Sequence, residues 1–286
     1  MSPGEARVSR EADLAAVMRL EWAEVVRSRW LLVCIGVYAG LAALFVLVGL
    51  RESSVLGFTG LGRMLFSLSH ALLLLLPLIA LAATGQVVNR ARDDGSLELL
   101  LSHPLRRSRY LAAVTATRFL ALSAPLVLML LLIGAVGRVV TGEPVPWSFV
   151  LRACGLCTAL LWAFSALGIA ISVAVRSPAR AMTVVVLAWG AGVALLDFGL
   201  IGVMLTWHLD PAAVFSLAVL NPVECARVAL LAAAQPDLAT LGPVGFFLTH
   251  RLGPDRLLAL GLLWPVLFGA LAWAGALRSF RRGDLV

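Results

Sequence analysis

Three residues in hydrophobic stretches carry side chains that could do chemistry. Cys154 and Cys157 stand three positions apart in an apolar run, and a Cys-x-x-Cys pair can bind a soft metal or carry sulfur. Small thiol side chains in such a run also serve as packing residues. Asp197 ends a long uncharged stretch. A carboxylate buried in a membrane is energetically costly, so Asp197 is a candidate functional residue. The alternative is that it marks a bend near the surface. The sequence leaves both alternatives open for each site.

Several common catalytic sites are absent from the sequence. All 23 basic residues are arginine, and the missing lysine excludes a P-loop ATPase site and Schiff-base chemistry. The four histidines are scattered, and no His-Glu-x-x-His motif, Gly-x-Ser-x-Gly elbow or EF-hand spacing occurs. We therefore expect no resident metal or cofactor and no enzymatic activity of this chain alone.

The composition predicts an all-α protein that crosses a membrane several times. Of the 286 residues, 61% are hydrophobic and 14% are charged, whereas a soluble domain has about 45–50% and about 25%. The mean hydropathy is +0.97. Six apolar runs are long enough to cross about 30 Å of hydrocarbon. They cover residues 30–50, 64–88, 110–136, 151–175, 180–206 and 257–277.

The arginines predict the orientation of these spans. Fifteen arginines lie in the N-terminal segment, the second and fourth connectors and the C-terminal tail, against seven on the opposite side. The positive-inside rule then places both chain ends in the cytoplasm and the long segment 207–256 outside. The sequence thus predicts one transmembrane domain, residues 30–286, which follows an N-terminal segment of residues 1–29.

Residues 1–29 precede the first span and carry many charges, which argues against a cleaved signal peptide. Within them, residues 12–29 alternate apolar and charged positions near helical spacing, with Trp22 and Trp30 at the expected headgroup depth. This pattern predicts a lead-in helix along the cytoplasmic interface. An ordinary solvated segment is the alternative.

The cytoplasmic connector, residues 89–110, has the most specific pattern. Gly95 is expected to interrupt the preceding segment. Ser96 can then cap a new helix, and Glu98 lies in the first turn of that helix. Pro104 ends that helix after about two turns. So short a helix is not stable alone and needs a groove on its own protein or on a partner. Its apolar face consists of Leu97, Leu100 and Leu101.

Residues 93–110, Asp-Asp-Gly-Ser-Leu-Glu-Leu-Leu-Leu-Ser-His-Pro-Leu-Arg-Arg-Ser-Arg-Tyr, resemble the signature between the second and third spans of type-2 ABC exporter permeases. The resemblance implies a homodimer in a bacterial inner membrane. It also implies two copies of a separate ATPase that bind ATP and magnesium. In that family this segment is the coupling helix that docks on the ATPase. The matching positions are Gly95, Ser96, Leu97, Glu98, Leu100, Leu101 and Pro104.

The outer segment contains a second motif at residues 220–227, Leu-Asn-Pro-Val-Glu-Cys-Ala-Arg. It predicts a helix start, with Asn221 as N-cap, Pro222 at the first position and Glu224 closing a capping box. Glu224 can then pair with Arg227 one turn later.

The motif at 220–227 and Leu-Gly-Pro-Val-Gly-Phe-Phe at 241–247 also resemble the permeases of nitrous-oxide-reductase maturation systems. That resemblance implies a sulfur or copper-related cargo and a periplasmic partner. Docking of the partner would then involve Asn221, Pro222, Glu224 and Arg227, with Asp197, Cys154 and Cys157 as a candidate cargo pathway. The alternatives are an exporter of a lipid, drug or polysaccharide precursor, and a membrane scaffold that transports nothing.

Overall fold

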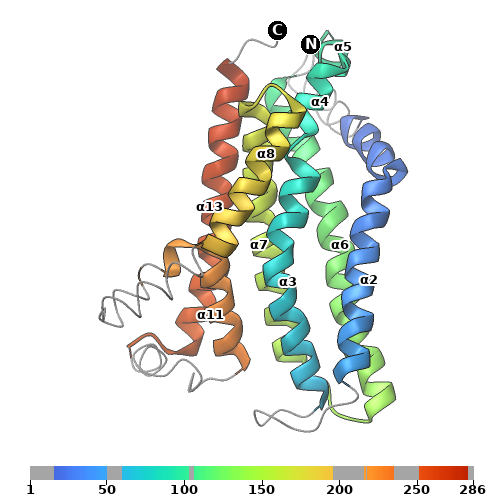
Figure 1. The fold of residues 1–286 in the computed structure, drawn as a ribbon, viewed down its shortest axis with the longest axis vertical. Helices are drawn as coiled ribbons and strands as arrows, with labels where there is room; N and C mark the ends of the chain where they lie inside the picture. Colours follow the sequence, from blue (N-terminus) through green and yellow to red (C-terminus); the bar gives the residue numbers. More distant parts are fainter. Residues whose placement is uncertain are drawn as a thin grey trace, which may run out of the picture.

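The computed structural model describes residues 16–49, 60–102, 106–195, 216, 218–234 and 251–282. Every regular element in these ranges is a helix, which confirms the all-α prediction. Five of the described helices are long and apolar enough to cross a membrane, and they run along the long axis of the molecule (Figure 1). They are α2 (Arg29–Gly49), α3 (Gly60–Thr84), α6 (Arg107–Thr141), α7 (Trp147–Ala174) and α13 (Gly253–Arg282).

The fifth predicted span, residues 180–206, is described only in its first part. It begins as α8 (Pro178–Trp189) and continues as a short π-helix, η1 (Gly190–Leu195). Pro178 occupies the first turn, where its missing N–H costs nothing. The rest of this span, including Asp197, lies outside the described residues.

Helix α7 forms the centre of the bundle, packed against α3, α6 and α13. Gly168 of α7 lets α3 come close, because a Cβ atom at this position would lie 2.0 Å from Oγ1 of Thr84. Gly261 of α13 does the same for the outer helix described below, since its Cβ would lie 2.3 Å from the Cβ of Ala229. The central helix is therefore held by contacts that a larger side chain would disrupt.

One end of the bundle gathers the polar elements. The lead-in helix (residues 16–27), α4 (Val87–Asp93), α5 (Ser96–Leu101) and the last turns of α13 lie together there (Figure 1). We call this the arginine-rich end, because it carries the arginines of the lead-in helix and of the 89–110 connector. The topology predicted from the arginines likewise places these segments on one side.

Helix α11 (Pro222–Ala234) lies in the opposite half of the molecule, beside α13 (Figure 1). Its 13 residues extend only about 20 Å, too short to cross a membrane. Val223, Ala226 and Leu230 are fully buried, and the helix packs against α13, α7 and α3. The helix that follows the motif at residues 220–227 is therefore short and buried on protein.

Candidate functional site

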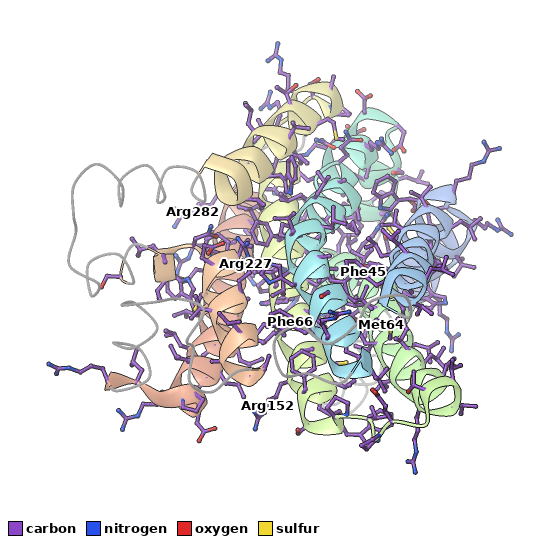
Figure 2. The ribbon with its side chains drawn as sticks, turned by 60° about the horizontal axis from the view of Figure 1, so that its bottom comes forward. Phe45, Met64, Phe66, Arg152, Arg227 and Arg282 are labelled. Carbon is purple, nitrogen blue, oxygen red and sulfur yellow. The ribbon has the colours of Figure 1, made fainter. Side chains whose placement is uncertain are left out.

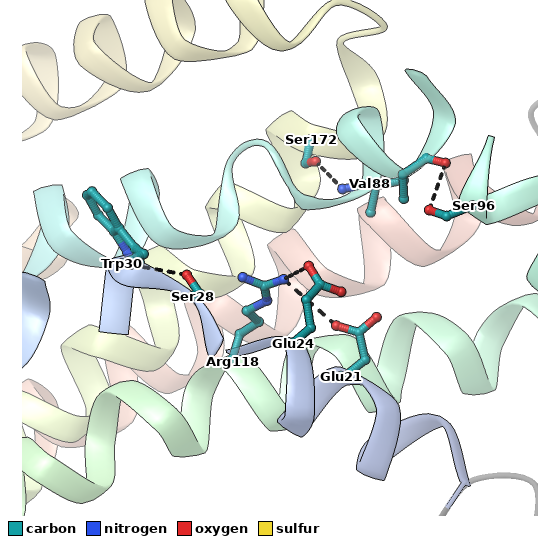
Figure 3. Close-up of polar contacts among 9 residues, drawn as sticks. Glu21, Glu24, Ser28, Trp30, Val88, Ser96, Arg118 and Ser172 are labelled. Atoms are coloured by element: carbon teal, nitrogen blue, oxygen red, sulfur yellow. Dashed lines mark hydrogen bonds and ion pairs between the residues drawn. The ribbon is translucent and has the colours of Figure 1, made fainter. Parts of the chain in front are cut away.

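Helix α4 is fastened to the end of α7 by hydrogen bonds. Oγ of Ser172 accepts hydrogen bonds from the backbone N–H groups of Val88, at 2.7 Å, and Asn89, at 3.3 Å. Arg92 Nη1 donates to the carbonyl oxygen of Val173 at 3.1 Å. Figure 3 shows the Ser172 contact beside the helix start. A displacement of α4 must therefore move the end of the central helix with it.

The chain turns sharply between α4 and α5. Gly95 has a φ of 74°, a left-handed conformation that favours glycine, so the predicted break is confirmed. Asp94 Oδ1 accepts a hydrogen bond from the Ser96 backbone N–H at 2.9 Å, and the hydrogen bonds from Ser96 lower the pKa of Asp94. The prediction that Ser96 caps α5 is wrong, because Ser96 is the first helical residue and Asp94 supplies the capping oxygen. Pro104 lies outside the described residues.

The leucine face of α5 packs on this chain. Leu97 is fully buried in a cluster with residues of the lead-in helix, α4, α6, α7 and α13, and Leu100 and Leu101 pack partly against the same cluster. Leu97 therefore makes no direct contact with a partner in this conformation, as the self-packing alternative requires. Glu98 and Leu99 lie on the outer face instead, and Leu99 is 72% exposed.

The exposed Leu99 was missed by the sequence analysis. Three leucines in succession, residues 99–101, cannot all lie on one face of a helix with 3.6 residues per turn. That geometric signal was available, because the spacing that directs Leu97, Leu100 and Leu101 inward directs Leu99 outward.

An ionic cluster joins the lead-in helix to α6. Nη2 of Arg118 lies 3.3 Å from Glu24 Oε1 and 3.8 Å from Glu21 Oε2, as Figure 3 shows. Glu21 is only 4% exposed, and its burial raises its pKa to about 7 even though Arg118 lowers it. No spacing in the sequence pairs Arg118, which lies within an apolar run, with either glutamate.

A cleft of about 860 Å³ opens beside this ionic cluster at the arginine-rich end. The lead-in helix forms one wall, and the end of α3, α4, α5, α6 and the start of α8 form the others. Charged side chains of both signs line it, namely Glu21, Glu24, Asp94, Arg27, Arg90 and Arg118.

The cysteine pair lies inside the bundle. Cys157 is fully buried, and Cys154 is 8% exposed at the edge of an open groove between α7 and α13. Neither forms a disulfide. Over the described ranges, no group of three or more His, Cys, Asp or Glu residues is placed to hold a metal ion. The geometry thus matches the packing alternative for these thiols.

Asn221 begins α11 as predicted. Its Oδ1 accepts a hydrogen bond from Val223 N at 3.0 Å, and its Nδ2 donates to the carbonyl oxygen of Gly192 at 2.6 Å. The capping box is incomplete, because the Asn221 N–H donates to Ala218 O. Gly192 lies 14 positions beyond Pro178, roughly 21 Å along the helix, so α11 begins beside the far part of this predicted span.

The predicted pairing of Glu224 with Arg227 is confirmed. Nη2 of Arg227 also lies 3.3 Å from Nε2 of His70 on α3, and Figure 2 shows Arg227 at the bundle side of α11. Asn221 is 3% exposed and Pro222 is buried. These two residues are therefore internal, which contradicts their role in partner docking. Glu224 and Arg227 keep partly exposed side chains, at 18% and 24%.

Comparisons with known proteins agree with this architecture. The family model for the ABC-2 family transporter protein matches residues 15–285. The chain is 27% identical over 270 residues to the "Probable ABC transporter permease protein NosY" of Stutzerimonas stutzeri, covering 91% of this chain and 92% of that protein. It is 28% identical over 286 residues to the protein of the same name from Pseudomonas aeruginosa, covering 93% and 95%. With its helical bundle and a family match along nearly its whole length, the chain belongs to the ABC-2 family of transporter proteins.

Proposed function

We propose that this chain is the membrane subunit of an ATP-driven exporter and that α5 is its contact with a separate ATPase. The observation that carries this proposal is the two-sided character of α5, with Leu97 buried on its own bundle and Leu99 exposed on the other side. A helix that transmits motion from an ATPase to the membrane domain needs one contact with the ATPase and one with its own helical bundle. The ATPase would take Glu98 and Leu99, and the bundle would receive the motion through Leu97.

The route from α5 into the membrane follows the hydrogen bonds already described. A push on α5 reaches α4 across the short turn at Gly95, and α4 is bonded to Ser172 and Val173 of α7. Because α7 packs against α3, α6 and α13, its displacement reaches most of the bundle. Rigid-body movement of packed helices is an established way to switch a transporter between states.

Two copies of the chain around a two-fold axis would enclose the cargo route, each copy binding one ATPase that carries ATP and magnesium. The arginine-rich end would face the cytoplasm by the positive-inside rule. We place the dimer in a bacterial inner membrane, with α11 in its outer half.

The cargo we propose is a sulfur or copper-related species, delivered to a periplasmic partner that matures the copper centre of nitrous oxide reductase. The NosY-type relatives and the motif at residues 220–227 support this assignment. Of the residues expected to bind the partner, Glu224 and Arg227 are the ones with exposed area to offer. In this proposal Cys154 and Cys157 are packing residues and do not bind the cargo.

The ATPase contact is tested by Leu99→Asp, with Leu99→Met as the conservative control. Aspartate at this exposed position should leave the permease folded, and burying its charge in an apolar contact costs several kcal/mol, roughly. Pull-down of the ATPase, normalised to permease recovered as a monodisperse peak in detergent, should fall sharply for Leu99→Asp and remain for Leu99→Met. Normal binding by Leu99→Asp would refute α5 as the coupling contact.

The cargo assignment needs a different experiment. A strain that lacks this gene should produce nitrous oxide reductase without its copper–sulfur centre, detected by the visible spectrum of the purified enzyme. The wild-type gene should restore the spectrum and Leu99→Asp should not. A normal enzyme spectrum in the deletion strain would refute the proposed cargo but would not affect the proposed ATPase contact.

A further inference from the structure

The cleft at the arginine-rich end is placed where a lipid headgroup would reach it. The lead-in helix that forms one wall exposes Leu20, Trp22 and Val26, at 53%, 46% and 53%. Exposed apolar and aromatic side chains on a helix that precedes a membrane span are typical of a helix lying in the interface. The cleft behind this helix therefore opens into the headgroup layer rather than into bulk water.

The basic side chains of the cleft offer a site for a phosphate. Among the residues that the structure describes, Arg27 forms no ion pair, and the Arg90 guanidinium donates to the amide oxygen of Gln86, one turn away on its own side of the cleft. Arginine is well suited to phosphate oxygens because its planar group carries several N–H donors. Arg118 is occupied by Glu21 and Glu24.

The acidic side chains offer a site for a cation. Glu24 is 66% exposed, although its Oε1 contacts Arg118. Glu21 and Asp94 line the same cleft. A carboxylate accepts hydrogen bonds through both oxygens, so Glu24 can bind Arg118 and an ammonium group together. A ligand with both a phosphate and a cationic group could thus place its phosphate against the arginines and its cation against the carboxylates of the cleft.

We propose that this cleft binds a zwitterionic aminophospholipid, with its phosphate at Arg27 and Arg90 and its ammonium group at Glu24. The glycerol and the upper acyl chains would lie on the apolar parts of the wall, formed by Leu20, Ala82, Ala83, Val87 and Met182. The bound lipid would hold the lead-in helix to α4 and α6. The proposal needs the membrane placement of the chain but not its ATPase or cargo.

The charges distinguish between lipid classes. A choline headgroup has no N–H donor for Glu24, so it forfeits that charge-assisted hydrogen bond. An anionic glycerol headgroup has no ammonium group, so nothing in the ligand offsets the negative charges of Glu24 and Asp94. We therefore expect ethanolamine lipid to bind about tenfold more tightly than choline or glycerol lipid of the same acyl chains.

The test uses the full-length purified protein and native mass spectrometry. The detergent-solubilised chain is titrated with dioleoyl phosphatidylethanolamine, phosphatidylcholine or phosphatidylglycerol, and the first bound lipid is quantified. Equal binding of all three would show an unselective lipid annulus and overturn the proposal. Preference for phosphatidylglycerol would overturn it in favour of a purely basic site.

A pair of arginine variants locates the site. Arg27 lines the cleft, whereas Arg19, on the same helix and also exposed, does not. Arg27→Gln should weaken phosphatidylethanolamine binding about tenfold, and Arg19→Gln should leave it unchanged. Equal effects of the two variants would place the lipid elsewhere.

Glu24 tests the cation half of the site. Glu24→Gln should remove the preference for ethanolamine over choline while phosphate binding at Arg27 remains. Circular dichroism and size exclusion confirm folding, and the Arg27 comparison decides the proposal if Glu24→Gln does not fold. A preserved ethanolamine preference in folded Glu24→Gln would refute the assigned headgroup orientation.

Discussion

Replacing Glu21 by glutamine should make docking of the lead-in helix independent of pH and stronger at alkaline pH. Burial raises the pKa of Glu21 from its ordinary 4.5 to about 7, with Arg118 opposing the rise. At about 1.4 kcal/mol per pH unit, this rise favours the protonated docked state by roughly 3 kcal/mol. The contribution is complete below pH 4.5 and is lost as pH rises through about 7. Wild-type docking should therefore weaken between pH 5.5 and pH 8.5, whereas Glu21→Gln has no charge to bury.

Spin labels at the exposed positions 19 and 93 would report the separation of the lead-in helix from α4 by pulsed electron resonance. Of this roughly 3 kcal/mol, about 2 kcal/mol is lost between pH 5.5 and pH 8.5, which changes the docking equilibrium roughly thirtyfold. Glu98→Gln is the matched control, because Glu98 is exposed and lies outside the ionic cluster. The reasoning fails if the wild-type distance distribution is the same at both pH values, or if Glu21→Gln docks less than wild type at pH 8.5.

Three further substitutions test the packing. Leu97→Ala should destabilise the chain by about 2–5 kcal/mol, because the side chain is fully buried, whereas Leu99→Ala should leave the melting temperature unchanged. Gly168→Ala should cost about 1–3 kcal/mol through overpacking, while Gly36→Ala, with nothing within 4 Å of its Cβ, should be harmless by the same thermal assay. Asn221→Ala should cost about 1–2 kcal/mol through the lost cap, measured as increased hydrogen exchange in the first turn of α11.

The parts of the fold that follow from local chemistry were predicted from the sequence. Hydrophobic length located the spans, and left-handed Gly95 and the Asn221 cap gave the starts of α5 and α11. The Glu224–Arg227 pair needed only the helical repeat. These features depend on neighbours within a few residues, which the sequence shows directly.

The parts that depend on contacts between distant segments were not predicted. Arg118 meets Glu21 and Glu24 across nearly a hundred positions of sequence, and no spacing rule connects them. The inward side of the α5 leucines depended on whether this chain supplied a groove, which only the packing of six helical segments decides. Asn221 was predicted as a cap, but its bond to Gly192 required the fold.

The short helix α11 has a consequence for the biogenesis of this protein. Asn221 at its start bonds to η1, which is synthesised before it, but much of its buried face rests on α13, which is synthesised after it. Because α11 is too short to stay in the bilayer alone, its buried face lacks a packing partner until α13 is inserted. Completion of the membrane domain is therefore delayed until α13 has been synthesised, and nascent chains stopped before residue 253 present an unassembled α11 to the quality-control proteases of the membrane.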